Sequence, residues 1–168
     1  MFLATLASSG WAIAVKQTLV KVQERGLARR FLFPAALVVV LGAGYLSSLM
    51  PGIGGSGDTI KFQFVGKVLG VAHAPGYPLY TVLNHLFVTV WPFGSVAYKA
   101  NLLSAVYAVG ACVMLFKLLR LLDVRGIVAL VSALVFGFSK VFWSQAVVAE
   151  VYTLLVLFMA AVGYFLIK

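Results

Sequence analysis

The sequence contains four carboxylates able to do acid–base chemistry: Glu24, Asp58, Asp123 and Glu150. A carboxylate can act as a general base when it lies within hydrogen-bond reach of the proton that it removes. Asp58 begins a stretch, residues 58–70, whose apolar positions recur with helical spacing and predict an amphipathic helix along the membrane surface. An acid at that position is typical of an N-cap. A cap can also hold a catalytic carboxylate in place, so both interpretations stay open.

Glu150 lies between two apolar runs, in a polar segment that also contains Lys140, Ser144 and Gln145. An acid at the edge of a membrane span costs free energy unless it is paired or faces water. An ion pair with Lys140 is one explanation, and a site that faces water is the other. Asp123 lies close to two arginines and predicts an ion pair within a loop.

The segment H-A-P-G-Y-P-L, residues 73–79, combines two prolines with a glycine and predicts a rigid turn. This turn would present His73 and Tyr77 to whatever the loop covers, although a lone histidine in a turn is more often structural. No second His, Cys or acid stands at metal-ligand spacing, and the chain has a single cysteine, Cys112. We therefore predict no resident metal site from the sequence.

Residues 52–57, G-I-G-G-S-G, formally match the dinucleotide-binding pattern G-x-G-x-x-G. That pattern binds a dinucleotide only after a strand and inside a βαβ unit. Here it follows an uncharged run of 20 residues, so it predicts a sharp exit from the membrane.

Composition indicates the elements that must position these residues. The chain has 168 residues, 63% hydrophobic and 10% charged, whereas soluble domains are about one quarter charged. Its 13 Lys and Arg residues flank apolar runs, as the positive-inside rule requires of membrane proteins. This placement argues against a nucleic-acid partner, which needs a basic patch on a water-soluble surface.

We predict an all-α membrane protein with about four transmembrane helices, at residues 31–50, 100–119, 126–143 and 151–168. Each is close to the length that crosses the hydrocarbon core at a rise of about 1.5 Å per residue. Residues 1–30 are expected to be a cytoplasmic segment, and residues 51–99 a loop on the opposite face.

Pro78–Trp91 is the ambiguous stretch, because its apolar helix is only about 14 residues long, a length that favours a re-entrant or interfacial helix. If it does not cross, nine basic residues lie on the cytoplasmic side and four on the other; if it crosses, the division is seven to six. The four-span arrangement is therefore preferred, and it puts Asp58 and Glu150 on the same, non-cytoplasmic face. The nine are Lys16, Lys21, Arg25, Arg29, Arg30, Lys117, Arg120, Arg125 and Lys168.

The order of these motifs resembles a known family. After the acid and the turn come P-F-G-S-V-A-Y-K-A-N-L-L-S (residues 92–104) and F-W-S-Q-A-V-V-A-E-V-Y-T-L (residues 142–154). Together they resemble the polytopic membrane glycosyltransferases of the GT-C superfamily. The nearest group is a bacterial and eukaryotic family, formerly a domain of unknown function, that includes a vertebrate protein O-mannosyltransferase. The resemblance covers residues 58–168 and implies a GT-C-like N-terminal module, so the chain is expected to be truncated.

The resemblance implies transfer of a sugar, with mannose as the first candidate, from a polyprenyl-phosphate-linked donor to a hydroxyl of a protein or glycan. The reaction would occur on the non-cytoplasmic face of the bacterial inner membrane or the endoplasmic reticulum. Asp58 matches the acid of the first outer loop and Glu150 the acid of the second. His73 matches the family's turn, with Ala74 in place of a proline, and Lys61 stands where an acid is expected.

The proposed chemistry also fits the residue types. A phosphate leaving group needs cationic stabilisation, and the acceptor hydroxyl needs a carboxylate base. Asp58 is the expected base, and Glu150 is expected to orient the acceptor. We predict no cofactor and leave a divalent cation open. The alternatives are a non-catalytic assembly subunit of a membrane complex and a transporter fragment. The residues expected to bind the donor phosphate or substrate are Lys61, His73, Tyr77, Lys99, Lys140 and Gln145.

Overall fold

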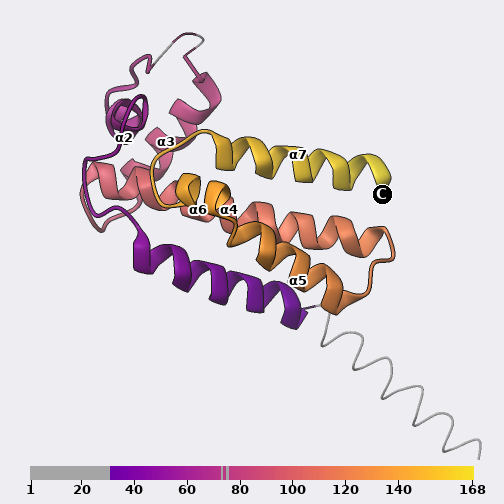
Figure 1. The fold of residues 1–168 in the computed structure, drawn as a ribbon. Helices are drawn as coiled ribbons and strands as arrows, with labels where there is room; N and C mark the ends of the chain where they lie inside the picture. The colour runs from indigo at the N-terminus through magenta and orange to yellow at the C-terminus, as the bar shows by residue number, and fades with distance from the viewer. Residues whose placement is uncertain (1–30, 73, 75) are drawn as a thin grey trace, which may run out of the picture.

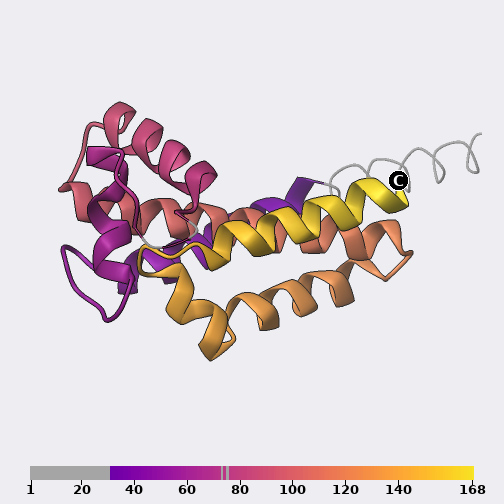
Figure 2. The ribbon, with the colours of Figure 1, turned by 90° about the horizontal axis from the view of Figure 1, so that it is seen from above.

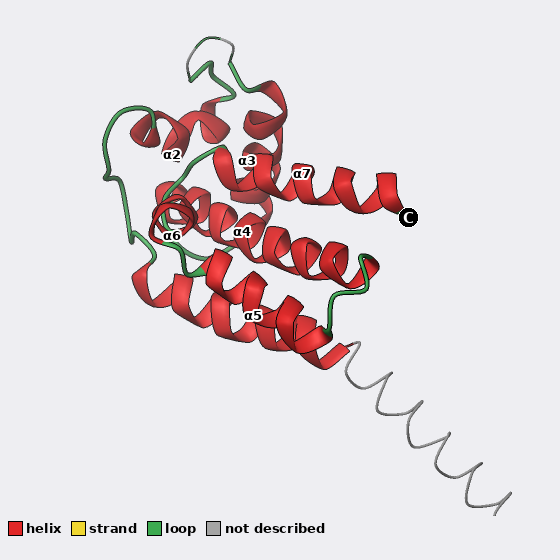
Figure 3. Cartoon of the chain, turned by 45° about the vertical axis from the view of Figure 1, so that its right-hand side comes forward, coloured by secondary structure: helices red, strands yellow, loops and turns green. Residues whose placement is uncertain are grey.

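The computed structural model describes residues 31–72, 74 and 76–168, and these residues form helices and loops without a strand (Figure 3). The expectations for residues 1–30 and for His73 lie outside the described residues. The first described helix is Phe31–Ser48. It is followed by α2 (Thr59–Val68), α3 (Pro78–Val90), α4 (Val96–Leu121), α5 (Gly126–Gly137), α6 (Lys140–Ala146) and α7 (Tyr152–Ile167).

Four helices run lengthwise beside one another and form a helical body: Phe31–Ser48, α4, α5 and α7 (Figures 1 and 2). α4 is central, since it packs along α7 and also contacts α5. Its buried face is rich in small residues, with Ala105, Ala108 and Ala111 at most 4% exposed. Small side chains let helix backbones approach closely, which is how membrane helices commonly associate.

The first helix joins this body through apolar packing and one buried polar contact. Leu37, Leu41 and Tyr45 are fully buried in the same core cluster as the α4 alanines. The Tyr45 hydroxyl donates a hydrogen bond to the Gly137 carbonyl, 2.9 Å away at the end of α5. An amphipathic tyrosine buried in this way needs such a partner.

The four expected spans are confirmed only in part. Phe31–Ser48 and α4 have the length and hydropathy of complete spans. The expected single helix at 126–143 is wrong, because the chain breaks after Gly137 and bends by 68° between α5 and α6. If this bent pair is taken as one span, it is the third. α7 has 16 residues and is shorter than a complete span. The chain is a membrane protein, and its full number of spans stays a prediction.

The two short helices expected in the loop after the first span are both present, and they lie at one end of the body (Figures 1 and 2). α2 occupies Thr59–Val68, within the expected 58–70, and ends at Leu69 in the left-handed conformation (φ 51°). α3 starts at Pro78, a favourable first helical position, and stops before Trp91. Ile60, Phe64 and Val68 of α2 are exposed, whereas Gln63 on another face is fully buried.

α4 begins earlier than expected. Its first residue is Val96, not Ala100, because Ser95 caps it: the Ser95 hydroxyl accepts a hydrogen bond from the Tyr98 N–H at 3.2 Å. The four additional residues are Val96, Ala97, Tyr98 and Lys99, so Lys99 lies within the helix.

Candidate active site

Glu150 lies in the loop between α6 and α7 and is held at both its backbone and its side chain. The Thr59 hydroxyl donates a hydrogen bond to Glu150 Oε1 at 2.5 Å. The Glu150 N–H donates to Ser104 Oγ at 3.1 Å, and that hydroxyl lies 3.3 Å from the Glu150 carbonyl. Glu150 is therefore anchored to the first residue of α2 and to α4.

Asp58 directly precedes Thr59, so the acids of the first and second loops lie near one another at this end of the molecule. Asp58 occupies the N-cap position of α2, but its backbone is helical (φ −80°, ψ −14°) and its side chain makes no capping hydrogen bond. Its Oδ1 instead lies 2.8 Å from Lys61 Nζ. The expected side-chain cap is wrong, because the carboxylate is directed toward the lysine one turn along the helix.

The expected ion pair between Lys140 and Glu150 is also not formed. Within the described residues the ion pair present is Lys61–Asp58, and Lys140 is exposed at the first residue of α6, just after the bend. Glu150 bonds to Thr59 instead. Asp123 likewise makes no ion pair within the described part of the chain; Arg120 donates to the Val124 carbonyl.

The surroundings of Glu150 favour its protonated form. Burial raises the pKa of Glu150 above its usual range, because a carboxylate loses solvation inside the protein. The hydrogen bonds from Thr59 and from the Val151 backbone lower that pKa, and the negative charge of Asp58 raises it. The two acids are thus close enough to influence one another.

Asn101, near the start of α4, connects the segments that carry these acids. Its Oδ1 accepts from the Ala149 N–H at 2.8 Å and from Gln63 Nε2 at 3.1 Å. Its Nδ2 donates to the carbonyls of Met50 at 2.9 Å and Gly52 at 3.3 Å. Asn101 is fully buried, and these four bonds use its full hydrogen-bonding capacity.

The glycine-rich segment after the first span is bound to α2 through Gln63. Gln63 Oε1 accepts from the Gly54 N–H, and Gln63 Nε2 donates to the Gly54 carbonyl, both at 3.0 Å. Gly55 (φ 102°) and Gly57 (φ 62°) adopt backbone angles that favour glycine. The segment follows the helix Phe31–Ser48 rather than a strand and makes a folded turn before α2, so the dinucleotide pattern has no structural support here.

The other expected site residues that the structure describes have contacts away from the two acids. Lys99 Nζ donates to the Val88 carbonyl at 3.1 Å, near the end of α3. Tyr77 has a left-handed backbone (φ 46°), and its ring meets that of Phe62 edge-on, with centroids 5.6 Å apart. Gln145 Nε2 lies 3.5 Å from Ser144 Oγ. Of the expected phosphate-binding residues, Lys61 is the one placed against Asp58.

Sequence reasoning missed the four residues that build the site: Thr59, Gln63, Asn101 and Ser104. All four are at most 5% exposed. Asn101 and Ser104 are the N and S of the motif at residues 92–104, so a polar residue pair inside an otherwise apolar helix was the available signal. Only the tertiary contacts reveal their partners.

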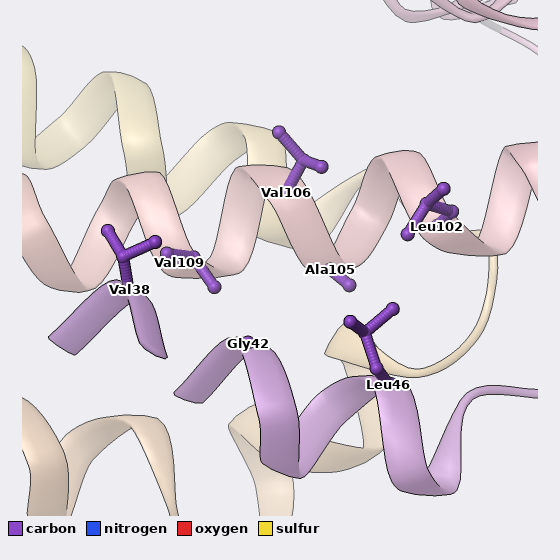
Figure 4. A pocket seen from close by; sticks show the side chains of 7 residues that line it. All are labelled: Val38, Gly42, Leu46, Leu102, Ala105, Val106 and Val109. Carbon is purple, nitrogen blue, oxygen red and sulfur yellow. The ribbon is translucent and has the colours of Figure 1, made fainter. Parts of the chain in front are cut away.

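No three His, Cys, Asp or Glu residues gather in the described part of the chain. A pocket of about 240 Å³ lies between Phe31–Ser48 and α4 (Figure 4). It is lined by apolar residues alone and has no side chain to bind phosphate or accept a proton: Val38, Gly42, Leu46, Leu102, Ala105, Val106 and Val109.

Comparison with known proteins identifies the region that contains both acids. The sequence model of the family described as "Protein O-mannosyl-transferase TMEM260 N-terminal domain" matches residues 58–168, from Asp58 to the last residue. The chain belongs to this family. The resemblance to the family that includes a vertebrate protein O-mannosyltransferase is thereby confirmed, and the GT-C-like fold stays a prediction.

Two curated relatives in the TMEM260 family are similar to this chain. Protein O-mannosyl-transferase TMEM260 of Mus musculus is 42% identical over 98 residues, which are 58% of this chain. Protein O-mannosyl-transferase tmem260 of Dictyostelium discoideum is 31% identical over 118 residues, 69% of this chain. In each case the match covers 14% of the relative's length. No solved structure matches the chain.

Proposed function

We propose that this chain is the acid-bearing N-terminal module of a membrane glycosyltransferase. It transfers mannose from a polyprenyl-phosphate-linked donor to a hydroxyl of a protein acceptor, on the non-cytoplasmic face. The observation that carries the proposal is the hydrogen bond between Thr59 and Glu150, because it joins the loop with Asp58 to the loop with the second acid. Both loops lie within the segment that matches the family.

In the proposed reaction Asp58 accepts the proton of the acceptor hydroxyl. The hydroxyl oxygen attacks the anomeric carbon of the sugar, a new glycosidic bond forms, and the bond from that carbon to the phosphate oxygen breaks. The polyprenyl phosphate leaves with the bonding electron pair. Glu150 orients the acceptor by accepting a hydrogen bond. A positioned base of this kind accelerates a reaction by about 10²–10⁴-fold.

Lys61 is the proposed cation for the donor phosphate among the described residues. It lies against Asp58, and both side chains are partly exposed, at 47% and 38%, so a donor can reach them. A lysine ammonium binds phosphate as a point charge and stabilises the charge that develops on the leaving group. The expected roles of Lys99, Tyr77 and Gln145 receive less support, since their contacts lie elsewhere. The same holds for Lys140, which is exposed at the first residue of α6.

The test is sugar transfer by membranes that contain the protein encoded by the natural gene. Radiolabelled mannosyl polyprenyl phosphate and a peptide rich in Ser and Thr are the substrates. Asp58→Asn should reduce transfer by at least about 10²-fold while membrane insertion is unchanged. Ser47→Ala, an exposed position at the end of the first span, is the matched control and should transfer at the normal rate. Unchanged transfer by Asp58→Asn would contradict the proposal and favour an assembly subunit or transporter fragment.

The shared membrane face is tested separately by labelling cysteines with a reagent that does not cross membranes. Asp58→Cys and Glu150→Cys are each placed in a Cys112→Ala background, which removes the natural thiol. Both positions should react from the non-cytoplasmic side. Labelling from opposite sides would overturn the shared site.

A further inference from the structure

The structure assigns Thr59 as a positioning residue for the second acid: its hydroxyl holds the Glu150 carboxylate in place beside Asp58. This inference rests on the proposed function, in which both acids take part. It goes further because it gives a defined task to a residue that the motifs did not single out.

Thr59 is covalently joined to Asp58 and hydrogen-bonded to Glu150 Oε1 at 2.5 Å. One residue thereby links the acid of the first loop to the acid of the second, which is 92 positions away in the chain. A displacement of Thr59 therefore changes the position of Glu150 relative to Asp58.

The side chain of Thr59 is buried against the glycine turn. Its side chain is 5% exposed, so its hydroxyl is not available to bulk water. A Cβ placed on Gly55 would lie 2.9 Å from Thr59 Cγ2, which means that the glycine turn packs directly against the threonine methyl. The rotamer that directs the hydroxyl at Glu150 is thus supported by packing.

A charged carboxylate in a half-buried site needs hydrogen-bond donors to stay ionised, and Thr59 supplies one to its side chain. The hydrogen bond from Thr59 lowers the pKa of Glu150 and opposes the effect of burial. Without the hydroxyl, Glu150 would become protonated at a higher pH.

Several other titratable or charged groups face Glu150. At the N-cap of α2 it is Asp58, whose charge raises the pKa of Glu150 and whose carboxylate pairs with Lys61. On α3 it is Tyr80, whose own pKa is raised by burial and, to a smaller extent, by Glu150. Tyr107 of α4 lies close to Tyr80. These groups are unchanged in a Thr59 variant, so a shift in Glu150 titration reports on the hydroxyl.

The experiment measures sugar transfer against pH with the protein encoded by the natural gene, using mannosyl polyprenyl phosphate and the peptide acceptor. Thr59→Val keeps the shape of the side chain and removes the hydroxyl. The acidic limb of its profile, where transfer falls as the pH is lowered, should move to higher pH by about one unit. Loss of a hydrogen bond to a charged group changes the pKa of that group by about this amount. Thr59→Ser retains the hydroxyl and should restore the wild-type limb.

Thr153→Val is the matched control. Thr153 is fully buried, lies near the start of α7 and has a hydroxyl without a hydrogen-bond partner in the described structure. It should leave the acidic limb in place. An unshifted limb in Thr59→Val, an equal shift in Thr153→Val, or a failure of Thr59→Ser to restore the limb would each overturn the inference.

Asp58→Asn separates this inference from the proposed function. If Asp58→Asn transfers sugar normally, the proposed function fails. If Asp58→Asn is inactive and Thr59→Val has a normal pH profile, the positioning role of Thr59 fails and the proposed function stands.

Discussion

The helical body and the site end of this molecule are stabilised by different kinds of interaction. The helical body, formed by Phe31–Ser48, α5 and most of α4 and α7, buries leucine, alanine and aromatic side chains. The site end, formed by α2, α3, the first turns of α4 and the loop before α7, has its own small apolar cluster around Phe62 and Tyr80. Apart from the Tyr45 hydroxyl in the helical body, the buried polar side chains of the described structure lie at the site end or at the adjoining start of α7: Thr59, Gln63, Thr81, Asn84, Asn101, Ser104 and Thr153.

This difference follows from what each region must do. Apolar helices satisfy their backbone groups internally and need only close packing. The site end contains loops, whose backbone groups have no helical partner and must be satisfied by side chains such as Asn101 and Gln63. Burying a polar network costs free energy unless every member is bonded, so a chain that retains one uses it to fix a specific geometry. Here the fixed geometry is that of Asp58 and Glu150.

The largest expected effect on stability comes from Asn101→Leu. It leaves the Ala149 N–H and the Met50 carbonyl buried without their partner, which should cost about 3 kcal/mol of unfolding free energy. Unfolding of the detergent-purified protein measures the loss. Leu102→Met conserves volume at the next position and should cost less than about 1.5 kcal/mol. Equal losses of unfolding free energy in the two variants would contradict the proposed difference between the two regions.

Ala133→Leu tests the body by overfilling it. Ala133 of α5 is fully buried against the other helices, and the added atoms should cost about 1–3 kcal/mol. Because the site end is held by separate contacts, the acidic limb of the transfer profile should stay in place. A shifted limb would mean that the two regions are mechanically coupled.

Glu150→Gln should stabilise the fold at neutral pH while it reduces transfer. Burial raises the folded-state pKa of Glu150, so ionisation weakens the folded protein above that pKa, and lowering the pH through it removes the penalty. The gain is expected to be below about 1 kcal/mol, because the side chain is only half-buried and solvent screens it. Thermal unfolding should show a higher Tm for the variant at pH 7 and equal values in acid; a lower Tm at pH 7 would contradict this account.

The smallest expected effect on stability is that of Lys61→Met. Its ion pair with Asp58 is partly exposed, and such pairs contribute less than about 1 kcal/mol. Transfer should nonetheless fall, mainly through weaker donor binding and a higher KM. Lys67→Met, an exposed lysine on the same helix, is the control and should leave the KM for the donor unchanged.

Much of the fold could be predicted from the sequence, because membrane helices correspond to uncharged apolar runs of residues. The first span and the two short loop helices are confirmed to within a few residues. The break between α5 and α6 was missed, since Phe138 and Ser139 lie in a run that is apolar enough to continue as one helix. The expected Lys140–Glu150 pair was wrong because Glu150 bonds instead to Thr59, which is 91 positions away in the chain. The expected side-chain cap of Asp58 was wrong because its carboxylate pairs with Lys61.

The sequence by itself determined that this is an all-helical membrane protein of a glycosyltransferase family, and it indicated both acids. Hydropathy and motif order contain that information locally. The tertiary structure decided which group each acid contacts: Thr59 for Glu150 and Lys61 for Asp58. It also made Asn101 the link between three segments of the chain. Hydrogen-bond partners depend on distances of about 3 Å between residues far apart in the chain, and only the folded arrangement of the helices sets such distances.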